Sequence, residues 1–71
     1  MTKERLLAIM ESAQLSRDDL SAVSGRTTRQ TYAWTTGEAP VPRPLALVLY
    51  ALEDNAISFD WLVEAIRKDR Q

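Results

Sequence analysis

The sequence predicts an all-α domain of five helices. Apolar residues recur every three or four positions along most of the chain, which is the spacing of amphipathic helices rather than of strands. Helix stops separate these stretches, most clearly Gly25, Gly37 and the prolines between residues 40 and 44. The 71 residues include no linker-like stretch, so we expect one domain over residues 1–71, small enough to gain stability from an oligomer interface or a ligand.

The first two helices are predicted over residues 2–13 and 17–24. Thr2 is a suitable N-cap for the first helix, which carries one apolar stripe. Ser16 precedes the second helix and Asp19 follows three residues later, which is a variant of the capping box. A glycine then ends the second helix.

The third helix is predicted to begin after a cap at Thr27 or Thr28 and to end before Gly37. Its surroundings, residues 24–37, hold two arginines and many threonines but few apolar side chains, of which Trp34 is the largest. Such a helix has little to bury. Its polar groups are therefore better explained by a binding function than by core packing.

The last two helices complete the predicted domain. Pro44 suits the first position of the fourth helix, where its missing N–H has no partner to lose. Residues 45–53 are apolar nearly all round, which predicts burial in the core and against a partner. The fifth helix is predicted to begin at a Ser58 or Asp60 cap and to serve packing or dimerisation.

The chain contains neither cysteine nor histidine. This excludes disulfides, the usual zinc sites and catalytic triads. The adjacent acids, Asp18 with Asp19 and Glu53 with Asp54, are explained by helix capping and solvation. We therefore predict a protein that is not an enzyme and needs no metal and no cofactor. Charges interrupt the first apolar stretch, so we also expect a cytoplasmic protein without a membrane partner.

The formal net charge of −1 hides an uneven distribution. From Arg26 to Arg43, three arginines outweigh the single acid, Glu38, by two charges. Residues 53–60 carry three acids and no base. An acidic protein can thus have one basic face, which permits a nucleic-acid partner.

Two short helices joined by a glycine-containing turn form the helix-turn-helix pattern. The stretch LSRDDLSAVSGRTTRQTYAWTTG resembles that of the Cro and phage-repressor-like regulators, the Xre class. In that family a Leu-Ser pair opens the second helix, a glycine makes the turn, a Ser or Thr caps the third helix, and a Trp and a further glycine follow. The corresponding residues are Leu15, Ser16, Gly25, Thr27, Trp34 and Gly37. The resemblance covers about residues 6–52 and extends to GEAPVP, which is similar to the connector of one subgroup.

The resemblance implies a lambda-repressor-like fold and a sequence-specific DNA-binding transcriptional regulator. It further implies a homodimer that binds an inverted repeat of double-stranded DNA with each third helix in the major groove. Regulators of this kind include repressors and autorepressors of phages and mobile elements, among them those associated with anti-CRISPR genes. The negative net charge leaves a second function open, namely a protein-interaction module such as an antitoxin or inhibitor on the same scaffold.

Candidate DNA-contact residues lie on the outward side of the third helix and near the starts of the second, third and fourth helices. Groups that can read base edges are Thr28, Arg29, Gln30 and Tyr32. Groups that can hold phosphates, and so set the register on DNA, are Arg17, Arg26, Thr27 and Arg43. Apolar candidates for the dimer interface are Leu49, Leu52, Phe59, Trp61 and Leu62.

The register of the third helix has two alternatives. The family usually has apolar residues where this chain has Ser24, Arg26 and Thr31, and burying an unpaired polar group costs about 1–3 kcal/mol. Without an extra residue in the turn, Thr31 and Trp34 face the core. With one, Tyr32 turns inward and Trp34 leaves the core.

Overall fold

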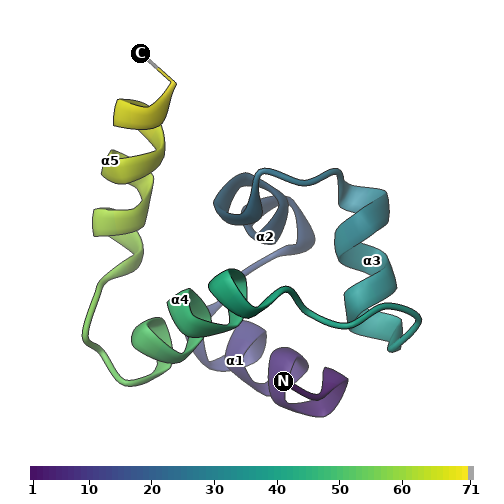
Figure 1. The fold of residues 1–71 in the computed structure, drawn as a ribbon. Helices are drawn as coiled ribbons and strands as arrows, with labels where there is room; N and C mark the ends of the chain where they lie inside the picture. The colour runs from purple at the N-terminus through teal and green to yellow at the C-terminus, as the bar shows by residue number, and fades with distance from the viewer. Residues whose placement is uncertain (71) are drawn as a thin grey trace.

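The computed structural model describes residues 1–70 and contains five α-helices (Figure 1). They are α1 Lys3–Ala13, α2 Arg17–Ser24, α3 Thr28–Thr36, α4 Arg43–Glu53 and α5 Phe59–Asp69. No strand occurs within residues 1–70, so the predicted all-α class is confirmed. In the same part of the chain, no helix has the length and apolar character needed to cross a membrane.

Side-chain caps determine where most of these helices begin. Four hydroxyls accept a backbone N–H three residues further on, those of Thr2, Ser16, Thr27 and Ser58. Of the alternatives left by the sequence, Thr27 rather than Thr28 caps α3, and Ser58 rather than Asp60 caps α5. The predicted capping box at the start of α2 is also formed. In α4 the proline at position 44 is the second helical residue rather than the first.

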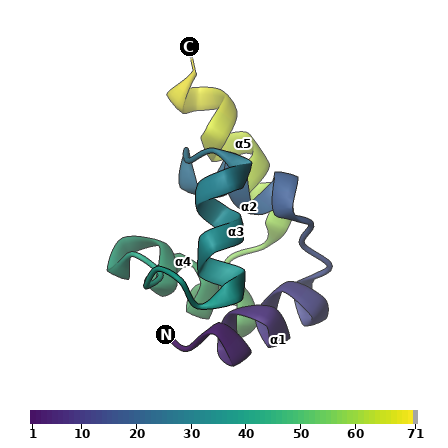
Figure 2. The ribbon, with the colours of Figure 1, turned by 90° about the vertical axis from the view of Figure 1, so that its right-hand side faces the viewer.

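The helices surround one apolar core, and α2 lies between α3 and α5 (Figures 1 and 2). α1 packs against α3 and α4, whereas α5 packs chiefly against α2 and extends away from the rest of the domain (Figure 1). All five helices contribute to the core, which consists of Leu6, Ile9, Met10, Leu15, Leu20, Trp34, Leu45, Leu49, Leu52 and Leu62.

Three of the residues predicted at a dimer interface belong to this core. Leu49, Leu52 and Leu62 are buried within the single chain. An apolar pattern marks positions that avoid water, but it does not distinguish burial by the same chain from burial by a partner. Of the five candidates, only Phe59, which is half-buried, and Trp61, which is 57% exposed, remain for a partner.

The register of α3 is the one without an extra turn residue. Thr31 is 0% exposed and Trp34 is 6% exposed, whereas Tyr32 is 49% exposed. The Thr31 hydroxyl donates to the carbonyl of Thr28 at 2.8 Å, so its burial leaves no polar hydrogen unpaired. Trp34 is the one large apolar side chain that α3 buries in the core.

The other two polar positions near the turn are also accommodated. Ser24 is half-buried, and its hydroxyl donates to the carbonyl of Ser21 at 3.3 Å. The side chain of Arg26 is exposed. Within residues 1–70, no buried side-chain nitrogen or oxygen lacks a hydrogen-bond partner. The energetic objection to this register therefore does not apply.

Candidate nucleic-acid interface

The turn between α2 and α3 is held by its own hydrogen bonds. Gly25 has a φ of +71°, a left-handed conformation that disfavours most side chains, and its N–H donates to the Ser21 carbonyl at 2.9 Å. The Ser21 hydroxyl donates to the carbonyl of Arg26, and the Arg26 N–H donates to the hydroxyl of Ser24 at 3.2 Å. These bonds tie the end of α2 to the residues that precede α3, and so orient the two helices.

Thr27 and Gln30, both predicted as DNA contacts, bond each other at the start of α3. The Thr27 hydroxyl accepts the N–H of Gln30 at 3.2 Å, and the Thr27 N–H donates to the side-chain oxygen of Gln30 at 3.1 Å. Folding of α3 thus occupies the hydroxyl of Thr27 and the amide oxygen of Gln30. Gln30 is exposed and still has its amide nitrogen as a donor to an outside group.

Replacing Thr27 with alanine is expected to lower the free energy of unfolding by about 1 kcal/mol, because the N-terminal N–H groups of α3 lose their cap. Thr28→Ala is the matched control, since Thr28 is exposed and is not the cap. Urea unfolding followed by circular dichroism measures both. Equal losses in the two variants would show that the cap does not stabilise α3.

Arg29 lies at the centre of the outward side of α3. Successive helical residues are rotated by about 100°, which places Arg29 roughly opposite the buried Thr31 and Trp34, with Tyr32 and Thr36 beside it. All three outward residues are exposed. This side of the helix therefore presents a guanidinium, a phenol and a hydroxyl to an external partner.

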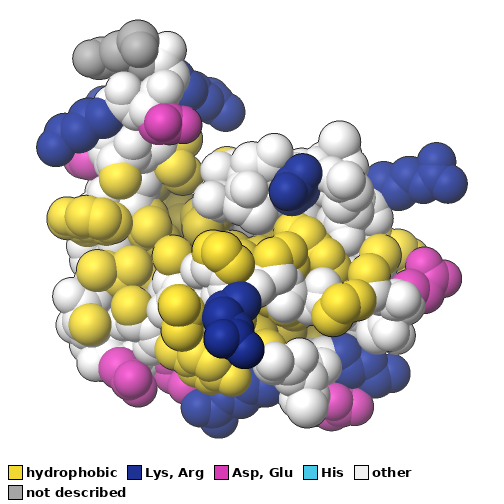
Figure 3. All heavy atoms as spheres, viewed as in Figure 1, with side chains coloured by type: hydrophobic (Ala, Val, Ile, Leu, Met, Phe, Trp, Pro, Cys, Tyr) yellow, Lys and Arg dark blue, Asp and Glu magenta, His cyan; other side chains and the backbone are white. Residues whose placement is uncertain are grey.

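The positive charge of this region is not neutralised inside the chain. Between Asp19 and Glu38 the sequence contains Arg26 and Arg29 but no acidic residue. The ion pairs within residues 1–70 are Arg5 with Glu53 and Arg67 with Glu64, so neither arginine of α3 and its turn takes part. Figure 3 shows basic side chains projecting near the α2–α3 turn, with the acidic ones on that side of the view lying lower. The surface suits an anionic partner.

Arg17 and Tyr32 are brought together although they are 15 positions apart in the sequence. The guanidinium carbon of Arg17, the first residue of α2, lies over the Tyr32 ring, 4.7 Å from its centroid. A distance below about 6 Å is that of a cation–π interaction. The sequence contains no signal for this contact, which depends on the angle between the two helices.

Arg43, the remaining phosphate candidate, is exposed at the first position of α4. The connector before it folds back onto α3, where the N–H of Ala39 donates to the carbonyl of Ala33 at 3.3 Å. Further along the connector, Pro42 borders the same surface hollow as Ala33 and Gln30. The start of α4 is thus attached to the side of α3.

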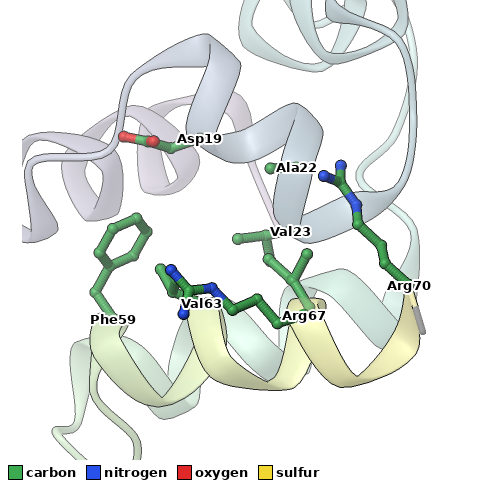
Figure 4. Close-up of a pocket in the computed structure, with 8 residues that line it drawn as sticks. Asp19, Ala22, Val23, Phe59, Val63, Arg67 and Arg70 are labelled. Atoms are coloured by element: carbon green, nitrogen blue, oxygen red, sulfur yellow. The ribbon is translucent and has the colours of Figure 1, made fainter.

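A groove of about 240 Å³ separates α2 from α5 on the far side of α2 from α3 (Figures 1 and 4). Apolar residues line much of it: Val23 of α2 lies across from Val63 of α5 (Figure 4), and Phe59 and Ile66 of α5 also line the groove. Arg67 runs along it (Figure 4). This groove gives α5 an apolar surface that the chain itself covers only in part.

Comparison with known proteins gives no family assignment for this chain. No protein-family model, curated protein or solved structure matches it. Within residues 1–70 there is also no group of three or more potential metal-ligating side chains. The function is therefore inferred from the side chains and their geometry.

Proposed function

We propose that this protein is a sequence-specific DNA-binding regulator in which α2, the turn and α3 form a helix-turn-helix. The observation that carries the proposal is the outward side of α3, with Arg29 at its centre and no acidic residue between positions 19 and 38. An α-helix fits the major groove of B-DNA, and an arginine there can donate two hydrogen bonds to one guanine.

The way α3 is anchored supports this function. A helix that reads bases must keep one side in the core while the other enters the groove. Trp34 and Thr31 hold the inner side. The turn that precedes α3 is fixed by a hydrogen bond that the Ser21 hydroxyl donates and by one that the Ser21 carbonyl accepts. Arg17, Arg26 and Arg43 are exposed around α3, where they can contact phosphates. Repression of a phage or mobile-element promoter, in the cytoplasm of the host, is the role that we propose.

Binding to DNA fragments tests the proposal directly. We expect the protein to shift the fragment upstream of its own coding sequence, and to do so less strongly as salt increases, because phosphate contacts release counterions. Selection from random DNA should enrich an inverted repeat whose half-sites lie roughly 34–36 Å apart. A selection that enriches no sequence would contradict sequence-specific binding.

We also propose that the regulator is a homodimer joined through α5. Phe59, Val63 and Ile66 lie on the side of this helix that borders the groove, at the spacing of an interhelical seam, and α2 covers them only in part. Asp60 and Arg67 flank that side, and seven residues, about two turns, separate them. In an antiparallel pair of α5 helices, each Asp60 faces Arg67 of the second copy. Because α5 and α3 lie on opposite sides of α2, such a dimer leaves both α3 helices free (Figure 1).

Exchanging the charges of Asp60 and Arg67 tests this pairing. Asp60→Lys places a lysine against Arg67 of the second copy, so we expect the dimer dissociation constant to rise about tenfold. Arg67→Glu places two acids opposite each other and should raise the constant by a similar factor. The double variant restores opposite charges and should restore the dimer. Analytical ultracentrifugation measures the dimer dissociation constants of the unmodified chain and of the three variants. If the double variant is as weak as the single ones, the antiparallel arrangement is incorrect.

A further inference from the structure

We infer that Tyr32 is a positioning residue: its ring holds the guanidinium of Arg17 in place, and Arg17 binds one DNA phosphate. This inference rests on the proposed function. It replaces the sequence-based prediction that Tyr32 reads a base edge. In the structure, the guanidinium carbon of Arg17 lies over the Tyr32 ring, 4.7 Å from its centroid.

The stack is not required by the core. Tyr32 is 49% exposed and Arg17 is exposed, so both side chains could extend into solvent instead. Arg17 also has an acidic neighbour, Asp18, but neither residue belongs to an ion pair within residues 1–70. The Arg17 charge is therefore directed onto the ring without being neutralised, and its N–H groups remain available to an anion.

Position favours a phosphate over a base edge as the anion. Arg17 begins α2, whereas the centre of the outward side of α3 is held by Arg29. When a second helix lies in the major groove, the first crosses the DNA backbone, so its side chains meet phosphates at the rim of the groove. A planar guanidinium can donate two parallel hydrogen bonds to a phosphate while its face rests on an aromatic ring.

Holding Arg17 in place before binding increases affinity because less side-chain freedom is lost in the complex. The stack therefore makes a quantitative prediction. Tyr32→Ala is expected to weaken DNA binding roughly two- to fivefold, the range of an exposed cation–π interaction. Tyr32→Phe keeps the ring and removes only the phenol hydroxyl, so it should bind like the unmodified protein.

A double-mutant cycle separates positioning from direct contact. DNA affinity is measured for the unmodified chain, Tyr32→Ala, Arg17→Ala and the double variant, by fluorescence anisotropy on one labelled site over a series of salt concentrations. We expect Tyr32→Ala to weaken binding only when Arg17 is present, and Arg17→Ala to lower the slope of log affinity against log salt by about 0.9. Circular dichroism melting shows that each variant is folded, as expected for exposed positions.

Three results would overturn the inference. If Tyr32→Ala weakens binding equally with and without Arg17, then Tyr32 contacts DNA itself. If Tyr32→Phe is as weak as Tyr32→Ala, the phenol hydroxyl rather than the ring is responsible. If Arg17→Ala leaves the salt slope unchanged, Arg17 does not hold a phosphate. Failure of the unmodified chain to bind any DNA would instead contradict the proposed function, so the two failures are distinguishable.

Discussion

Trp34→Ala is expected to leave most of the chain unfolded at 25 °C. Trp34 is 6% exposed and is the one large apolar side chain that joins α3 to the core. Truncating a buried tryptophan to alanine costs about 3–5 kcal/mol. The core of a domain this small rarely supplies more than about 3–5 kcal/mol of net stability, so the loss is comparable with the whole free energy of unfolding.

Far-ultraviolet circular dichroism and urea unfolding measure this effect. The other tryptophan provides a matched control, because Trp61 is 57% exposed and its truncation removes little buried surface. Trp61→Ala should change the free energy of unfolding by less than about 1 kcal/mol. The burial of Trp34 would be disproved if the two variants were equally stable.

Arg29→Ala is expected to cause the largest loss of DNA specificity among exposed substitutions. Arg29 is at the centre of the outward side of α3, and a bidentate arginine–guanine pair contributes about 1–3 kcal/mol of discrimination. Binding to the preferred site should weaken tenfold or more, and the preference at one base pair should disappear. Because Arg29 is exposed, the stability of the fold should not change.

The experiment compares the preferred site with a set of single base-pair substitutions. Lys68→Ala removes the same charge from the exposed side of α5 and should weaken all sites only slightly. If Arg29→Ala weakens every site by the same factor, Arg29 binds a phosphate instead of a base. A loss no greater than that of Lys68→Ala would remove Arg29 from the interface.

The local features of the fold were predictable from the sequence because neighbouring residues determine them. The hydroxyls at positions 2, 16, 27 and 58 cap helices through bonds that span only three residues. Gly25 and Gly37 end α2 and α3 in left-handed conformations, which are usual for a glycine just past the end of a helix. The burial of Trp34 in the core was one of the two alternatives that the sequence left open, and the structure shows that it is the correct one.

Features that depend on distant residues were predicted less well. The polar residues Ser24 and Thr31 appeared incompatible with burial, but each hydroxyl bonds a carbonyl of its own helix. Apolar spacing did not separate core leucines from surface ones, so Leu49 was misplaced at an interface although it is fully buried. The Arg17–Tyr32 stack depends on how α2 crosses α3, which is information that neither helix carries alone.

In the homodimer proposed above, the placement of α5 would couple folding to protein concentration. Because α5 packs chiefly against α2, fewer interhelical contacts stabilise it than stabilise the other helices. Its amide hydrogens should therefore exchange with solvent sooner. A second copy on its apolar side would protect these amides and raise the melting temperature by mass action. At high cellular concentration the protein would therefore be mostly dimeric and more stable. At low concentration it would be mostly monomeric and would be degraded faster.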